Sequence, residues 1–169
     1  YDLKIIEDAA QGFGGSINGR MAGAFGDIAT TSFFPAKPLG CYGDGGAVFT
    51  NNDEYADLLR SYRVHGKGTD KYDNVRIGVN SRLDTIQAAI LLEKLAVFPQ
   101  ELINRNKAAD NYKENLPSHL VTPDVPEGYV SSWAQYTVRS EQREQDMKAY
   151  QEQGIPTMVY YRTCMHQQT

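Results

Sequence analysis

The 169-residue sequence predicts an α/β fold, in which part of a mostly parallel sheet with flanking helices is followed by a small α+β domain. Short apolar runs at residues 4–7 and 28–33 each lead into a polar or glycine-rich loop, as buried strands of such sheets do. Longer segments at residues 53–63 and 83–98 carry apolar side chains at helical spacing. Apolar strands and amphipathic helices in the same chain indicate an α/β architecture.

The first elements of the chain are short and are separated by turn signals. Asn18-Gly19 predicts a tight turn after the first strand, and residues 46–50 predict a further strand that begins with small residues. Asn51 or Asn52 is placed to cap the helix that follows, and acidic residues in its first turn favour the helix dipole. One face of this helix is apolar and consists of Tyr55, Leu58, Leu59 and Tyr62.

A polar, irregular stretch at residues 64–80 separates this helix from the next. A loop of this length is typically functional, and a mobile surface loop is the alternative. Residues 83–98 form the clearest helix of the chain, apolar on most sides and therefore expected in the core or at a subunit interface. Pro99 is expected to end that helix or to begin the next one, which would run over residues 100–116.

The character of the sequence changes after residue 98, and we expect a domain boundary there. Residues 1–98 would be the C-terminal portion of a large domain, and residues 99–169 a truncated small domain. The small domain is predicted to contain a charged helix at residues 142–153, which Gly154 ends. Three strands are predicted in it as well, at residues 120–121, 132–138 and 155–161.

The composition narrows the class of protein. Apolar residues make up 41% and charged residues 22%, which is ordinary for a soluble globular protein. A net charge of −4 argues against a nucleic-acid partner, and no apolar run is long enough to cross a bilayer. Cys41 and Cys164 lie far apart and the three histidines show no metal-ligand spacing, so we expect no metal site and a reducing, cytoplasmic location.

Residues 27–47 contain the candidate reactive group, Lys37. Pro35 and Pro38 restrict the backbone on either side of this lysine, and several glycines follow it. A lysine held in a fixed direction, with the Ser32 hydroxyl five residues before it, suits a Schiff-base lysine. The alternative for this residue taken alone is a surface lysine in a loop rich in proline and glycine.

Asp8 closes the first apolar run and is the candidate acid. Ligands of open α/β sheets collect beyond the carboxyl ends of the strands, which is where Asp8 would lie. A carboxylate in this place would keep the ring nitrogen of pyridoxal phosphate protonated. Taken alone, Asp8 fits a solvated strand end or a helix N-cap better than a cofactor-binding acid.

Asn80 and Arg82 form a second candidate pair. On an extended segment, side chains two residues apart face the same way. An amide beside a guanidinium makes a good clamp for a phosphate or a carboxylate. The alternative for Arg82 is a salt bridge near a helix start.

Together these residues fit a known pattern, because the chain resembles the DegT/StrS (DegT/DnrJ/EryC1/StrS) family of sugar-nucleotide aminotransferases. That family belongs to fold type I of the pyridoxal-phosphate enzymes. The matching motifs cover nearly the whole chain in the family's order. They are IIEDAAQGFGG at 5–15, GDIATTSFFPAKPLGCYGDGGAVFTNN at 26–52, RVHGKGTDKYDNVRIGVNSRLDTIQAAILLEKL at 63–95, VSSWAQYTVR at 130–139 and GIPTMVYY at 154–161.

The resemblance implies a role for each matching residue. Lys37 would form the Schiff base with the cofactor, Asp8 would contact the ring nitrogen, and Gln11 would lie beside the ring. Ser32 would bind the cofactor phosphate, and Asn80 would reach the phosphate of the cofactor in the neighbouring subunit. The resemblance therefore implies a homodimer with shared active sites.

His166 stands where the family has a histidine facing the sugar-nucleotide substrate, and Arg82 is the other candidate substrate-binding residue. The chain departs from the family here, because Arg162 and Cys164 stand where many members have prolines. We expect the loop to be less rigid as a result.

The function that the resemblance implies is transfer of an amino group from L-glutamate to a nucleotide-linked keto sugar, such as a UDP-3-keto hexuronic acid, in surface-polysaccharide or glycan biosynthesis. Two alternatives stay open: a pyridoxal-phosphate-dependent sugar dehydratase or deoxygenase, and a non-catalytic regulatory relative that keeps the cofactor. Lys37 favours transamination, because the deoxygenating relatives replace this lysine.

Compared with members of the family it resembles, the chain lacks the N-terminal part. In the family that part carries the phosphate-binding helix terminus and the aromatic residue stacked on the cofactor. We therefore expect a fragment of a larger enzyme, inactive by itself. A naturally short paralogue or a processed product is the alternative.

Overall fold

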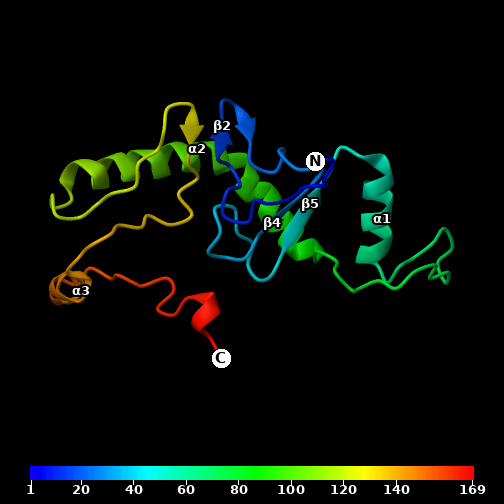
Figure 1. Cartoon of the computed structure of the whole chain (residues 1–169). Helices are drawn as coiled ribbons and strands as arrows, with labels where there is room; N and C mark the ends of the chain where they lie inside the picture. The colour runs from blue at the N-terminus through cyan, green and yellow to red at the C-terminus, as the bar shows by residue number, and fades with distance from the viewer. The chain divides into compact units, whose positions relative to one another are not determined.

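The computed structural model describes residues 1–169, and Figure 1 shows their arrangement. The chain forms two compact units, one of Tyr1–Glu114 and Asp124–Tyr136, the other of Asn115–Pro123 and Thr137–Thr169. The elements in chain order are β1 (Ile6–Asp8), β2 (Ser16–Ile17), β3 (Arg20–Met21), β4 (Ile28–Ser32), β5 (Gly46–Phe49), α1 (Asp53–Arg63), α2 (Thr85–Asn115), β6 (Tyr129–Val130), α3 (Arg143–Glu152) and the 3-10 helix η1 (Met165–Gln167).

The larger sheet of the first unit has the strand order β1-β4-β5. Strands β1 and β4 pair in parallel, with Asp8 opposite Thr30, whereas β4 and β5 pair antiparallel, with Ser32 opposite Gly46. The predicted α/β class is confirmed, but these three strands do not form a mostly parallel sheet. The reason is that residues 33–45 return the chain without a crossover helix, which a parallel connection requires.

A second small sheet has the order β3-β2-β6. Asn18 and Gly19 connect β2 and β3 with φ angles of 48° and 79°, so both adopt the left-handed conformation that a two-residue hairpin turn needs. The predicted turn is confirmed. Strand β6 joins this sheet from more than 100 residues further along the chain, through the pairing of Ser16 with Val130.

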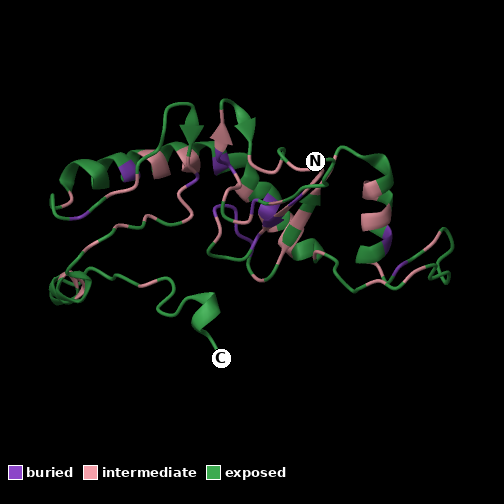
Figure 2. Ribbon diagram, viewed as in Figure 1, coloured by how far each residue is buried: buried purple, intermediate pink, exposed green.

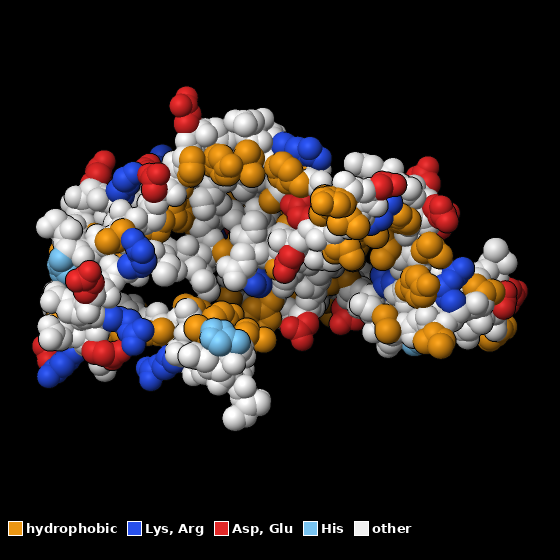
Figure 3. Space-filling view, in the orientation of Figure 1, with side chains coloured by type: hydrophobic (Ala, Val, Ile, Leu, Met, Phe, Trp, Pro, Cys, Tyr) orange, Lys and Arg blue, Asp and Glu red, His pale blue; other side chains and the backbone are white.

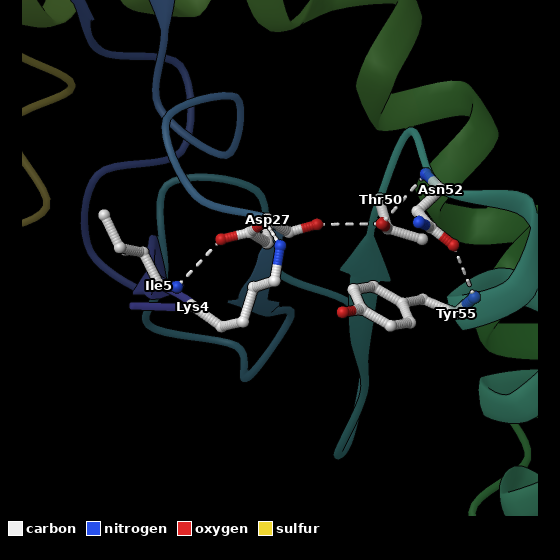
Figure 4. Close-up of polar contacts among 6 residues, drawn as sticks. All are labelled: Lys4, Ile5, Asp27, Thr50, Asn52 and Tyr55. Carbon is white, nitrogen blue, oxygen red and sulfur yellow. Dashed lines mark hydrogen bonds and ion pairs between the residues drawn. The ribbon is translucent and has the colours of Figure 1, made fainter. Parts of the chain in front are cut away.

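Helix α1 begins at the predicted place, and Asn52 rather than Asn51 caps it. The Asn52 Oδ1 atom accepts a hydrogen bond from the Tyr55 N–H at 2.9 Å (Figure 4). Asp53 and Glu54 occupy the first turn, where negative charge is favourable.

Asp27 connects α1 to the sheet (Figure 4). Its carboxylate accepts a hydrogen bond from the Ile5 N–H at 2.9 Å and pairs with the Lys4 ammonium at 3.2 Å. Its carbonyl accepts a hydrogen bond from the Thr50 hydroxyl at 2.8 Å, and Thr50 accepts one from the Asn52 N–H at 3.2 Å. These bonds tie the starts of β1 and β4 to the end of β5 and to the cap of α1.

We expect Asp27→Asn to lower stability at neutral pH. The Ile5 N–H and the Lys4 ammonium hold the pKa of Asp27 below its usual value. A carboxyl group whose pKa is lowered on folding stabilises the native state above its unfolded pKa of about 4, and this contribution is lost as the pH falls through the lower folded pKa. Thermal unfolding measured from neutral pH down to acid should therefore show the two midpoints converging.

The control for this prediction is Asp57→Asn, which removes an exposed carboxylate paired only with Arg60 on the same helix. Its unfolding midpoint should follow that of the wild-type protein at every pH. If Asp27→Asn were equally destabilised at all pH values, the charge of Asp27 would not be the source of its effect.

Residues 64–80 fold back on themselves as an excursion from the end of α1. Two antiparallel bridges close it, one of which joins Val64 to Asn80. At its base, the Ser61 hydroxyl accepts a hydrogen bond from the Arg76 guanidinium. Apolar side chains of the excursion reach the surface (Figure 3), and the most exposed of them are Tyr72, Ile77 and Val79.

Helix α2 is continuous through Pro99, so the predicted helix boundary at this proline is wrong. The buried residues Leu91, Phe98 and Ala109 are spaced by nearly whole numbers of turns and form one stripe. Packing of this stripe on both sides of Pro99 outweighs the backbone hydrogen bond that proline cannot make. The predicted domain boundary at residue 98 falls inside this helix, and the domain division of the full-length protein stays a prediction.

The core of the first unit forms where α2 packs against the loop that follows β4 (Figure 2). The ring of Phe13 stacks on Phe98 with 5.7 Å between centroids and on Phe49 with 6.2 Å. The buried members of this core are Phe33, Leu39, Cys41, Leu91 and Phe98.

The face of α2 opposite the buried stripe is exposed in this chain, so of the two predicted surroundings the core accounts for only one side of the helix. Ile86 is 74% exposed and Leu92 is 68% exposed. A subunit interface on this face stays a prediction. No helix of the chain, α2 included, is long and apolar enough to cross a membrane.

The segment after β6 does not form the strand predicted at residues 132–138. Side chains of α2 bind it instead. Arg105 donates a hydrogen bond to the Trp133 carbonyl at 3.1 Å, and the Trp133 indole N–H donates one to Asn106 at 3.1 Å. These partners from a helix take the place of a neighbouring strand.

The second unit contains α3, which confirms the predicted charged helix, and Gly154 follows it with a φ of 74°. The strands predicted at residues 120–121 and 155–161 do not form, apart from a single bridge between Val121 and Arg139. Residues 155–161 are largely exposed, and no strand lies beside them to complete a ladder.

Candidate active site

Asp8 and Ser32 lie at the same edge of the larger sheet. Asp8 ends β1 and Ser32 ends β4, and the two strands are parallel neighbours, so their carboxyl ends meet at one edge. Gln11 follows β1 by three residues and Lys37 follows β4 by five. The structure therefore brings four of the predicted site residues to the same edge, two at strand ends and two on the loops that follow.

The loop that carries Lys37 is closed at its base by backbone hydrogen bonds. The Phe33 N–H donates to the Gly45 carbonyl and the Cys41 N–H donates to the Phe33 carbonyl, both at 2.7 Å. Within the loop, the Lys37 N–H donates to the Phe34 carbonyl at 2.8 Å and completes a turn. The Lys37 side chain is partly buried, and its amine makes no hydrogen bond.

The polar groups at this edge fit pyridoxal phosphate. The Asp8 carboxylate is exposed and accepts one local hydrogen bond, from the Ala10 N–H at 3.0 Å, so an oxygen remains for a protonated ring nitrogen. The Ser32 hydroxyl oxygen accepts from the Phe34 N–H at 3.2 Å, which leaves its proton for donation to an anion. An acid, an amine and a hydroxyl donor are the groups that such a cofactor needs.

A hydrogen bond to its backbone holds Gln11 in place. Its carbonyl accepts a hydrogen bond from the Ser132 hydroxyl at 3.0 Å, and Ser132 is buried. Its side chain is exposed. The segment after β6 therefore fixes the turn that carries Gln11.

Asn80 and Arg82 lie side by side, as predicted for an extended segment, because the Arg82 Nε–H donates to the Asn80 Oδ1 atom at 3.1 Å. Both line an open hollow of about 1210 Å³ between α1 and β5, which does not include Asp8, Ser32 or Lys37. This hollow is therefore not the place where the predicted reactive groups gather.

His166 belongs to the second unit and lies in η1, with its side chain exposed. Its predicted contact with a substrate stays a prediction.

Glu7 is a residue of this region that sequence reasoning missed. Its carboxylate accepts hydrogen bonds from the N–H groups of Gly23, Phe25 and Gly26 at 2.7, 2.7 and 3.2 Å. Burial raises the pKa of this carboxyl group, but the three N–H donors and the Arg20 charge outweigh it and hold the pKa below its usual value. The available signal was an acid directly before Asp8 and a later loop rich in glycine.

Comparison with known proteins identifies the family of this chain. The sequence pattern of the DegT/DnrJ/EryC1/StrS aminotransferase family matches residues 1–169. A UDP-2-acetamido-2-deoxy-3-oxo-D-glucuronate aminotransferase of Pseudomonas aeruginosa is 47% identical over 169 residues, which cover 99% of this chain and 47% of that protein. A pleiotropic regulatory protein of Geobacillus stearothermophilus is 44% identical over 172 residues, which cover 99% of this chain and 46% of that protein.

Solved structures agree on the fold. A DegT DnrJ EryC1 StrS aminotransferase from Brucella abortus superposes with a TM-score of 0.95 at 56% identity, over 99% of this chain and 45% of that one. S. venezuelae DesV, solved with a ketimine intermediate, superposes with a TM-score of 0.91 at 38% identity, over 97% of this chain and 44% of that one. The chain thus spans just under half the length of the proteins it matches. Given a family match over all of residues 1–169, the chain belongs to the DegT/DnrJ/EryC1/StrS aminotransferase family.

Proposed function

We propose that the full-length protein uses pyridoxal phosphate to transfer an amino group from L-glutamate to a nucleotide-linked keto sugar. The observation that carries this proposal is the placement of Asp8 and Lys37 after two neighbouring parallel strands, at one edge of the sheet. Relatives named as aminotransferases of nucleotide sugars support the substrate class.

Each residue of the edge has a stated task in this proposal. Asp8 would keep the ring nitrogen protonated, Gln11 would lie beside the ring, and the Ser32 hydroxyl would donate a hydrogen bond to the phosphate. Lys37 would hold the cofactor through its amine. Once free, the same amine would take a proton from the α-carbon of the amino donor as a general base and would pass it on to the cofactor as a general acid. The bound cofactor supplies the electron sink for this proton transfer.

The substrate we propose is a UDP-linked 3-keto hexuronic acid, used in surface-polysaccharide or glycan biosynthesis in the cytoplasm. The name of the Pseudomonas aeruginosa relative supports this choice. His166 and Arg82 would bind the substrate, and Asn80 would reach the cofactor phosphate of a second subunit in a homodimer. The exposed apolar side chains of the excursion at residues 64–80 and of α2 are available for such a dimer contact.

A second candidate function is regulation without turnover. The Geobacillus stearothermophilus relative, named as a pleiotropic regulatory protein, favours it at 44% identity. Such a protein would keep the cofactor site but would not exchange the amino group. A sugar dehydratase or deoxygenase is disfavoured, because the proton carrier Lys37 is present.

Absorbance spectroscopy of the full-length protein distinguishes these functions. With pyridoxal phosphate added, we expect a visible band from lysine-bound cofactor, which L-glutamate should convert to the ultraviolet absorbance of the aminated cofactor. A band that L-glutamate leaves unchanged, but that another amino donor shifts, would show that L-glutamate is not the amino donor. A band that responds to no donor would favour the regulatory candidate, and no band at all would refute the cofactor assignment.

A further inference from the structure

Helix α2 holds the turn that follows Lys37 through the backbone of Tyr42. The Gln87 Oε1 atom accepts a hydrogen bond from the Tyr42 N–H at 2.7 Å, and the Gln87 Nε2–H donates one to the Tyr42 carbonyl at 2.8 Å. The Tyr42 side chain is 75% exposed, so the contact is with the backbone and not with the ring. One amide side chain therefore satisfies both backbone groups of a residue 45 positions away in sequence.

Lys94 provides a second anchor from the same helix. Its ammonium donates a hydrogen bond to the Gly40 carbonyl. Gln87 and Lys94 are seven residues apart, which is close to two helical turns, so both side chains leave the same face of α2. Between the two anchored residues, Cys41 is 1% exposed and its thiol lies 3.1 Å from the Phe33 carbonyl.

The anchored turn is linked to Lys37 by a short and stiff path. Only Pro38 and Leu39 separate Lys37 from Gly40, and both are buried. Proline has a fixed φ, so a movement of the turn is passed along the backbone rather than absorbed. The Gly40 backbone also packs closely against the start of the same loop, because a Cβ atom there would lie 2.6 Å from the Pro35 carbonyl oxygen.

We propose that Gln87, assisted by Lys94, is a positioning residue for Lys37. It acts through the backbone of Tyr42 and sets the direction and surroundings of the lysine amine without contacting cofactor or substrate. This inference rests on the proposed function, in which the Lys37 amine is the reacting group. The sequence carries no local sign of it, because the partners are distant along the chain.

The test uses the full-length protein without cofactor and compares Gln87→Leu with wild type. Hydrogen exchange of the backbone at residues 39–45 should speed up by about thirtyfold, since two hydrogen bonds worth about 1 kcal/mol each are lost. The rate at which acetic anhydride modifies the Lys37 amine, followed by mass spectrometry across pH, should change in the same variant. Lys94→Met should also speed up the exchange and alter the modification rate. Agreement between the two variants would show that the effect does not come from a folding defect specific to Gln87→Leu.

Two further variants sharpen the test. Gln100→Leu is the matched control, because Gln100 lies on the same helix and bonds only to Asn104 on the exposed surface; neither measurement should change. Gln87→Glu keeps an acceptor for the Tyr42 N–H but loses the donor for its carbonyl, so it should show an intermediate effect.

Unchanged exchange at residues 39–45 in Gln87→Leu and Lys94→Met would overturn the proposal. Faster exchange with an unaltered pH profile for Lys37 modification would also overturn it, because the contact would then be structural only. Neither measurement uses pyridoxal phosphate. A wild-type protein that forms no visible band would therefore refute the proposed function, and the exchange and modification rates could still be interpreted.

Discussion

Replacing Lys37 with alanine in the full-length protein is expected to abolish the visible band of bound pyridoxal phosphate and to reduce amino-group transfer at least about 10³-fold. The variant removes both the amine that holds the cofactor and the group proposed to carry the proton. The absorbance spectrum and the rate of 2-oxoglutarate formation from L-glutamate are the measurements.

The fold should tolerate this change. The Lys37 amine makes no hydrogen bond, and the turn around it is built from backbone contacts. The unfolding midpoint of Lys37→Ala should therefore stay near that of the wild type. Lys107→Ala, which removes an exposed lysine on α2, is the matched control and should keep both band and activity. A Lys37→Ala protein that retained the band would show that another amine holds the cofactor.

Replacing Phe98 with alanine is expected to destabilise the 169-residue chain by about 3–5 kcal/mol. Phe98 is 5% exposed and its ring stacks on Phe13 with 5.7 Å between centroids. It also approaches the backbone of Gly14 closely, because a Cβ atom on that glycine would lie 2.7 Å from the ring. The lost ring would leave a cavity that these neighbours cannot fill without moving.

Denaturant unfolding checks the size of this effect. Leu92→Ala is the matched control, because Leu92 lies on the exposed face of the same helix, and it should cost less than about 1 kcal/mol. If both variants were destabilised equally, the two faces of α2 would not differ in packing as the structure has them.

Much of the local structure could be predicted from the sequence. The helix over Asp53–Arg63, its asparagine cap and the turn at Asn18-Gly19 depend on neighbours within a few residues, and all three are confirmed. The strands predicted at residues 132–138 and 155–161 were wrong, because a strand needs a partner and the apolar pattern does not say whether one is present.

The candidate site also has a part that the sequence predicted and a part that depends on the tertiary structure. The sequence by itself determined which groups are available: an acid after one apolar run, and a hydroxyl and a lysine in a loop of prolines and glycines after another. It also determined the family, through motifs spread over the whole chain. Only the tertiary structure decided that β1 and β4 are parallel neighbours, so that Asp8 and Lys37 belong to one edge.

The structure alone also decided that α2 runs through Pro99 and that Gln87 holds Tyr42. The physical reason is the range of the interactions. Caps and turns are fixed by bonds between residues a few positions apart, so the local sequence is enough to predict them. Strand pairing, helix packing and a clamp across 45 residues depend on which surfaces meet when the chain closes.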